Sequence, residues 1–246
     1  MIEIKSVSKR YNKDEKDTIK DLNLSVNNGE IFAFLGPNGA GKTTTIKMMT
    51  GILAIDRGDI LIDGKSIATT PIEAKKNIGL VPDSPDMFLK LKGIEYLNFI
   101  SDIYDISIEI RNKRIQKYAN DLEIYDILND RIETYSHGTR QKIVIIGLLL
   151  HNPKNWILDE PLSGLDPKSA FYLKEKMKEH AKNGGTVFFS THILEVAEKL
   201  CDTIGIIDKG NLILLGTYKE IKEKFKEDNS LEEIFMEITK NDRKNK

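Results

Sequence analysis

The segment GPNGAGKT, residues 36–43, restricts the possible folds of this chain more than any other part of the sequence. It matches the pattern G-x-x-x-x-G-K-[ST], in which glycines allow backbone N–H groups to converge on phosphate oxygens. The apolar run IFAFL precedes it and a helical stretch follows, so we expect strand, loop and helix in that order. In such a loop Lys42 would supply positive charge to the phosphates, and the Thr43 hydroxyl would bind Mg²⁺. The weaker alternative is a glycine-rich turn with an exposed lysine.

Two adjacent carboxylates, Asp159 and Glu160, follow the apolar run WIL at 156–158. By itself, an acidic pair before Pro161 is most simply a turn at the end of a strand. Beside a phosphate loop the preference reverses, because α/β sheets bind ligands at the carboxyl ends of their strands. We therefore expect Asp159 to ligate Mg²⁺, and Glu160 to act as general base or orienting group for a water that attacks the γ-phosphate.

The pattern of the remaining chain indicates an α/β fold with a helical insertion. Strand-like alternation in MIEIKSVSKRY and TIKDLNLSVNNGE predicts an antiparallel hairpin. A helical stretch joins the apolar runs WIL and TVFFS, as in parallel β-α-β units. We expect a P-loop NTPase core with a mainly parallel sheet, an N-terminal antiparallel β subdomain and an inserted α-helical subdomain. The predicted single domain divides into a core of residues 1–84 and 152–215, a helical subdomain of residues 85–151, and a C-terminal helical extension and tail of residues 216–246.

Composition and hydropathy argue against several classes of protein. The 37 basic and 38 acidic side chains give a net charge of −1, so the charge balance favours no nucleic-acid partner. The longest apolar run, IVIIGLLL, is far too short to span a membrane, which takes about 20 residues. The first residues lack the order of a signal peptide, so we expect the mature chain to begin at Met1 and to reach a membrane only through a partner.

Further motifs make the chain similar to the nucleotide-binding subunits of ATP-binding cassette (ABC) transporters over essentially its whole length. SGLD at 163–166 resembles the D-loop of the family, and STH at 190–192 contains His192 at the position of the switch histidine. YSHGTRQK at 135–142 stands where the family has its LSGGQ motif. Tyr11 matches the aromatic residue on which the adenine base stacks. The resemblance implies an ATPase that uses ATP and Mg²⁺ to energise transport.

The resemblance also implies a role for individual residues. The catalytic set would be Glu160, Lys42 and His192, with His192 sensing the γ-phosphate. Ser136 and Gly138 would cap an ATP molecule bound to a second subunit, so that two subunits, in a homodimer or a heterodimer, enclose two ATP molecules. The implied metal ligands are Thr43, Asp83 and Asp159. The implied ATP-binding residues are Tyr11, Gly36, Asn38, Gly39, Ala40, Gly41, Lys42, Thr43, Thr44, Ser136, Gly138 and Asp166, the last at the shared interface.

Two parts of the chain depart from the family pattern. Asp83 stands where the Q-loop glutamine is expected. It is shorter and negatively charged, so it would reach Mg²⁺ only through water and would repel a phosphate without the metal. In the segment that replaces LSGGQ, His137 takes the place of a glycine and Thr139 that of the glutamine. Three interpretations of His137 stay open: a neutral surface residue, an extra hydrogen-bond donor, or a pH-sensitive donor.

The resemblance implies integral membrane subunits on separate chains as partners. Met87, Phe88 and Leu89 lie in the region that in the family receives a short helix of the membrane subunit, although packing within the helical subdomain explains them equally well. SLEEIFMEIT at 230–239 is similar to the ending of ABC-2 type exporter ATPases. Its apolar residues also suit an ordinary core-facing helix; they are Leu231, Ile234, Phe235 and Ile238.

We therefore expect an exporter ATPase on the cytoplasmic face of a cell membrane, and the abundance of lysine, isoleucine and asparagine is typical of a bacterial protein. Three alternatives remain. The first is a regulatory ABC protein with little or no turnover, as the departures at Asp83 and His137 would allow. The second is a soluble ABC ATPase that is not coupled to transport, and the third is a small-molecule kinase with a phosphate loop.

Overall fold

A six-stranded sheet runs through the centre of the computed structural model, which describes residues 1–12, 17–225 and 230–244. All neighbouring strands of this sheet pair in parallel except Asn211–Gly216 and Thr203–Asp208 at one edge, which pair antiparallel. The predicted mainly parallel sheet is therefore confirmed. Every residue of the strands that precede the phosphate loop and the acidic pair is buried, as expected for strands covered on both faces. The spatial order is β10 (Asn211–Gly216), β9 (Thr203–Asp208), β3 (Ile31–Leu35), β8 (Thr186–Thr191), β7 (Asn155–Asp159) and β6 (Ile78–Val81).

Parallel pairing brings the carboxyl ends of β3, β7 and β8 to one edge of this sheet. The phosphate loop follows β3, Asp159 is the last residue of β7, and His192 directly follows β8. Three motifs that are far apart in the sequence therefore meet at one edge, which is where open α/β sheets bind their ligands.

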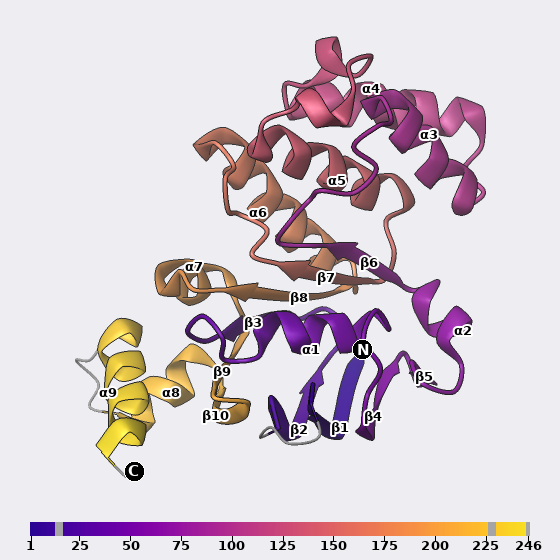
Figure 1. Ribbon diagram of the computed structural model, residues 1–246. Helices are drawn as coiled ribbons and strands as arrows, with labels where there is room; N and C mark the ends of the chain where they lie inside the picture. The colour runs from indigo at the N-terminus through magenta and orange to yellow at the C-terminus, as the bar shows by residue number, and fades with distance from the viewer. Residues whose placement is uncertain (13–16, 226–229, 245–246) are drawn as a thin grey trace.

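A second sheet, of four antiparallel strands, confirms the predicted N-terminal hairpin and extends it. Apolar side chains of its strands pack against α1 (Lys42–Met49) and against Phe32 and Phe34 of β3. Helix α1 therefore lies between the two sheets (Figure 1). The order of the second sheet is β2 (Ile19–Val26), β1 (Ile2–Lys9), β4 (Arg57–Ile62) and β5 (Lys65–Ser66), and the short helix α2 (Pro71–Lys75) leads from β5 to β6.

Helices cover the opposite face of the six-stranded sheet (Figure 1). Helix α6 (Pro167–Lys182) joins β7 to β8, as predicted, and packs on β3 and β8. Segment 85–151 contains three α-helices, and the third of them connects it to the core, because Leu148 packs on Gly79 of β6. Its elements are α3 (Gly93–Ile103), α4 (Ile108–Asp121) and α5 (His137–His151), with short 3₁₀ turns at Tyr125–Ile127 and Ile132–Thr134.

Three helices complete the described chain: α7 (Leu194–Leu200), α8 (Tyr218–Lys224) and α9 (Leu231–Lys244). Leu231 and Ile234 are fully buried, and Phe235 and Ile238 pack beside them, so the C-terminal apolar face contacts the core as an ordinary amphipathic helix would. Helix α9 lies on α7, the helix that follows His192. None of the helices in the described ranges is both long enough and apolar enough to cross a membrane.

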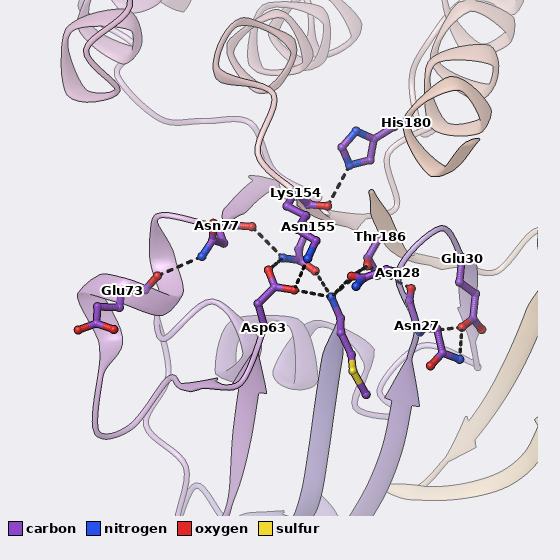
Figure 2. A network of polar contacts seen from close by, with 11 residues as sticks. Asn27, Asn28, Glu30, Asp63, Glu73, Asn77, Lys154, Asn155, His180 and Thr186 are labelled. Carbon is purple, nitrogen blue, oxygen red and sulfur yellow. Dashed lines mark hydrogen bonds and ion pairs between the residues drawn. The ribbon is translucent and has the colours of Figure 1, made fainter. Parts of the chain in front are cut away.

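A polar network connects the antiparallel sheet to the start of β7 (Figure 2). Asp63, which follows β4, accepts hydrogen bonds from Asn155 Nδ2 at 2.8 Å and from Lys154 Nζ at 3.0 Å. The amino group of Met1 lies 2.8 Å from the Asp63 carboxylate and 3.0 Å from Asn155 Oδ1. Because Asn155 is fully buried, these bonds fix the position of the amino end of β7 relative to the smaller sheet.

Candidate active site

The phosphate loop forms a tight curve between β3 and α1 because three of its residues are glycines. Gly39 and Gly41 adopt left-handed backbone angles, with φ of 78° and 115°. A side chain at Gly36 would overlap the carbonyl oxygen of Ile207 on the neighbouring strand β9. Ala40 is buried and closes the curve through its N–H, which donates to the Pro37 carbonyl at 3.1 Å. The loop therefore leads straight into the amino end of α1, where backbone N–H groups favour an anion.

Lys42, at the start of α1, points into this curve. Its side chain is 7% exposed, and Nζ donates to the carbonyl oxygens of Gly36 at 2.8 Å and Pro37 at 3.3 Å. The same ammonium lies 3.7 Å from Glu160 Oε1. The phosphate loop and Glu160 of the acidic pair, which the sequence predicted to act together, therefore meet at this lysine.

Tyr11 lies beside the amino end of the same helix. Its hydroxyl is 3.1 Å from Thr44 Oγ1, and about half of the residue is exposed. Thr43 is exposed whereas Thr44 is buried, so the two hydroxyls have different surroundings. The tyrosine ring thus stands at the side of the phosphate loop with accessible surface for a flat ligand group.

The two adjacent carboxylates do not share one environment. Asp159 is 2% exposed and accepts a hydrogen bond from Ser190 Oγ at 2.6 Å. Glu160 turns away from it because its backbone is left-handed, with φ of 46°, and its N–H donates to the same Ser190 hydroxyl at 3.0 Å. Ser190 stands opposite Asp159 in the parallel pairing of β7 and β8. It therefore orients both acids, a role that the sequence reasoning missed because it assigned a function only to His192 in the STH motif.

The Glu160 carboxylate lies between two basic groups. Oε1 is 3.7 Å from Lys42 Nζ, and Oε2 is 3.0 Å from His192 Nδ1. The glutamate side chain is 14% exposed, whereas His192 is 62% exposed. A carboxylate held in this way faces the pocket and is available to a water molecule beside a bound phosphate, which suits a general base or an orienting group.

A pocket of about 440 Å³ opens at this edge of the sheet, a size suited to a small-molecule ligand. Most of its lining was predicted from the sequence. Thr18, Pro37 and Ser163 also line it and were not predicted as ligand-binding residues. Pro37 lies within the motif GPNGAGKT and Ser163 begins SGLD, whereas Thr18 belongs to neither motif. The predicted residues that line the pocket are Asn38, Gly39, Gly41, Lys42, Thr43, Thr44, Asp83, Glu160 and His192.

The donors around the pocket fit a hard divalent cation such as Mg²⁺. Thr43 and Asp83 line the pocket, whereas Asp159, the residue before Glu160, is buried and does not line it. All three offer oxygen atoms, which this ion prefers. Within the described ranges, no group of three or more histidine, cysteine, aspartate or glutamate residues forms a protein-only metal cluster. A cation held here would therefore share its coordination with phosphate oxygens and water, as Mg²⁺ commonly does.

Six predicted ATP-binding residues do not line the pocket. Gly36 and Ala40 belong to the phosphate loop, and Tyr11 lies beside it. The other three are Ser136, Gly138 and Asp166. Ser136 caps helix α5, where its side chain accepts a hydrogen bond from the Thr139 N–H at 3.2 Å. Asp166 caps α6 and lies 2.7 Å from Lys142 Nζ, and this ammonium together with the capping bonds holds the pKa of the aspartate well below its usual range. Ser136, Gly138 and Asp166 lie at the starts of two helices, outside the lining of their own chain's pocket.

The sequence allowed two roles for the apolar residues after Asp83: a surface that binds the membrane subunit, or packing within the helical subdomain. The structure divides these residues between the two roles. Leu89 is partly buried and packs on the helical core. Met87 and Phe88 are 42% and 44% exposed. The Phe88 ring also contacts the rings of Tyr96 and Phe99 at centroid distances of 5.7 and 5.4 Å. An accessible aromatic surface therefore adjoins the loop that carries Asp83.

Comparison with known proteins identifies the family. The profile of the ABC transporter family matches residues 19–163, more than half of the chain, including the phosphate loop and the acidic pair. The chain belongs to the ABC transporter family. With the phosphate loop and Glu160 facing one pocket, it is an ATP-binding and ATP-hydrolysing subunit of an ABC transporter.

Similar ABC proteins include two from Bacillus subtilis (strain 168) and two solved structures. The linearmycin resistance ATP-binding protein LnrL of Bacillus subtilis (strain 168) is 36% identical over 90% of this chain and 70% of its own length. The ABC-type transporter ATP-binding protein EcsA of the same organism is 31% identical over 98% of both chains. A solved ATP-binding subunit of an ABC transporter superposes with a TM-score of 0.91 at 32% identity, over 97% of this chain and 99% of that one. The dimeric post-hydrolysis state of the ATP-binding cassette MJ0796, bound to ADP and Pi, superposes with a TM-score of 0.79 at 25% identity, over 88% and 98%.

Proposed function

We propose that this ABC subunit energises export through separate membrane subunits, and that ATP drives the closure of two ATPase subunits onto each other. Similarity to a relative named for linearmycin resistance supports export, because resistance to a toxic compound is commonly achieved by removing it. Differential affinity of the closed state for ATP over its products would be the thermodynamic source of the switch.

The position of Glu160 between Lys42 and His192 is the observation that carries this proposal. Lys42 would bind the β- and γ-phosphates, and the carboxylate would orient a water for attack on the γ-phosphate. His192 would contact the same phosphate and report its loss. Mg²⁺ held near Thr43 and Asp159 would offset phosphate charge.

ATP would be held through its base and its phosphates. Tyr11 would stack on the adenine ring, with its hydroxyl anchored to Thr44. The backbone N–H groups of the loop would bind phosphate oxygens at the start of α1. Gly36 and Ala40 would serve by shaping the loop, since a larger residue at Gly36 has no room.

A second ATPase subunit would complete each site. Ser136 and Gly138 lie at the amino end of α5, which favours an anion, yet they do not line the pocket of their own chain. We infer that they cap an ATP molecule bound to a partner subunit, with Asp166 at the same interface. The dimeric arrangement of the similar ATP-binding cassette MJ0796 supports two subunits; the partner is an identical or a different ATPase.

The membrane subunits would bind near the exposed aromatic surface of Phe88. Met87 and Phe88 are close in sequence to Asp83, which lines the ATP pocket, so a displacement of these two residues would also shift the lining of the pocket. Such a partner would hold the chain at the inner face of a bacterial cell membrane. The neutral charge balance supports the absence of a nucleic-acid partner.

Turnover by the purified chain, wild type beside Glu160→Gln, tests the proposal. We expect the variant to lose at least 100-fold in turnover, the order of a lost general base, while an ATP-bound dimer accumulates in size-exclusion chromatography with ATP and Mg²⁺. Glu179→Gln, a substitution on the surface of α6 outside the pocket, is the matched control and should keep full turnover. A wild type that binds ATP but neither hydrolyses it nor dimerises would favour the second candidate, a regulatory ABC protein in which Asp83 and Thr139 disable turnover.

A further inference from the structure

His137, the residue that replaces a family glycine, packs against the turn that follows Glu160. We call residues 160–166 the acidic turn. A Cβ atom placed on Gly164 of this turn would lie 2.6 Å from Cδ2 and 3.3 Å from Nε2 of His137. The three heavy atoms nearest to such a Cβ all belong to the His137 side chain. The ring therefore covers the surface of the turn that Gly164 leaves open.

The first two turns of α5 hold the acidic turn along its length. The backbones of Gly138 and Gly164 are in direct contact, because a Cβ at Gly138 would overlap the Gly164 carbonyl oxygen. Gln141 is 1% exposed, which makes its contact with the turn a buried one. Two side-chain contacts complete the attachment: Gln141 Nε2 to the Pro161 carbonyl at 3.4 Å, and Lys142 Nζ to the Asp166 carboxylate at 2.7 Å.

The other side of the acidic turn belongs to the ATP pocket. Glu160 and Ser163 both line the pocket, and the Ser163 N–H donates to the Glu160 carbonyl at 3.0 Å. Gly164 is the next residue and has φ of 72°. A shift of Gly164 would therefore be transmitted through one residue and one hydrogen bond to the backbone of Glu160.

We propose that His137 is a positioning residue whose flat ring fixes the acidic turn, and through it the catalytic carboxylate of Glu160. His137 directly follows Ser136, which is inferred to cap an ATP molecule bound to the partner subunit. The contact between His137 and Gly164 therefore connects this capping segment to Glu160, which acts on the ATP molecule bound to its own chain. The role depends on the shape of the ring, so it differs from a charge or a hydrogen bond offered by the imidazole. This inference rests on the proposed function and deepens it.

The contact is tested with a double-mutant cycle on thermal unfolding. Gly164→Ala in the wild type forces a methyl group into the His137 ring and also strains the backbone. We expect it to lower the Tm by about 4–8 °C, and by only about 2–4 °C in the His137→Ala background, where the strain remains and the clash is gone. Gly184→Ala is the matched control: φ is 85° and nothing lies within 4 Å of its Cβ, so the drop should be about 2–4 °C in both backgrounds. Equal drops for Gly164→Ala in the two backgrounds would overturn the contact.

The effect on the reaction is tested by steady-state turnover and by titration with the fluorescent analogue mant-ATP. We expect His137→Ala to lower kcat about tenfold, because a misplaced catalytic group reacts slowly, while the affinity for mant-ATP changes less than about twofold. His137→Phe keeps a flat ring without a nitrogen and should retain kcat within about threefold. Wild-type kcat in His137→Ala, or an equal loss in His137→Phe, would overturn the positioning role.

These outcomes separate the inference from the function on which it rests. Absence of ATP turnover in the wild type refutes the proposed function, whatever the unfolding data show. Equal Gly164→Ala penalties in the two backgrounds refute the role of His137 even in an active enzyme.

Discussion

Replacing Ser190 with alanine removes the one hydroxyl that holds both acidic residues of the active site. Ser190 Oγ donates to the buried Asp159 carboxylate at 2.6 Å and accepts from the Glu160 N–H at 3.0 Å. In the variant the carboxylate loses a buried hydrogen bond, and the N–H loses its acceptor. Part of the free energy that it costs to remove these two groups from water is then no longer offset by a hydrogen bond.

The magnitude follows from these two bonds. A hydrogen bond to a charged group contributes about 1.5–3 kcal/mol, and an unsatisfied, partly buried N–H adds to the loss, so we expect Ser190→Ala to lower the free energy of unfolding by about 3 kcal/mol. For a chain of this size that corresponds to a fall in Tm of about 6–12 °C. Turnover should fall about 10- to 100-fold, because Glu160 is no longer held in position. Urea titration followed by circular dichroism and a phosphate-release assay measure the two effects.

The matched control is Ser101→Ala in helix α3. Ser101 is also fully buried, but its hydroxyl donates only to the Leu97 carbonyl, four residues earlier in the same helix, at 2.8 Å. We expect a loss below about 1 kcal/mol and unchanged turnover, because no charged partner is left behind. An unfolding free energy of Ser190→Ala within about 1 kcal/mol of wild type, with turnover intact, would refute the reasoning.

Three further predictions concern other sites. Tyr11→Ala should weaken ATP binding about 5- to 100-fold by calorimetry through loss of stacking, whereas Tyr11→Phe, which keeps the ring and loses only the Thr44 contact, should stay within about threefold. Burial raises the pKa of the Cys201 thiol, so iodoacetamide at about pH 8 should label it only after unfolding in urea. Lys142 lowers the pKa of Asp166 in the folded protein, so the ionised aspartate stabilises the fold. This stabilisation is present above the pKa that the aspartate has in the unfolded chain, and it is lost as the pH falls through the lower pKa of the folded state. Lys142→Met should therefore reduce the loss of stability below about pH 4 in acid titrations.

Local sequence was sufficient to predict the elements that surround the site. Left-handed glycines, a lysine and a threonine at fixed spacing specify the phosphate loop, because each residue type acts through its own backbone or side chain. Continuous apolar runs predicted the buried strands β3 and β7, and alternation predicted the hairpin of β1 and β2. The position of the acidic pair at a strand end followed from the same pattern.

Contacts between residues that are far apart in the sequence could not be predicted from it. The partnership of Ser190 with Asp159 depends on the register between β7 and β8, which no local pattern encodes. The packing of His137 on Gly164 depends on how α5 meets a turn 27 positions further along the chain. The division between exposed Phe88 and the partly buried Leu89 depends on the packing of the helical segment.

The sequence by itself determined the family, the phosphate-binding loop and the order of strands and helices, because these depend on residue types and short spacings. Only the tertiary structure decided that Asp159 points into the protein and Glu160 into the pocket, between Lys42 and His192. Two adjacent residues of one charge look alike in a sequence. They acquire different tasks because parallel strands bring a serine beside one of them, and a left-handed backbone turns the other toward the phosphate loop.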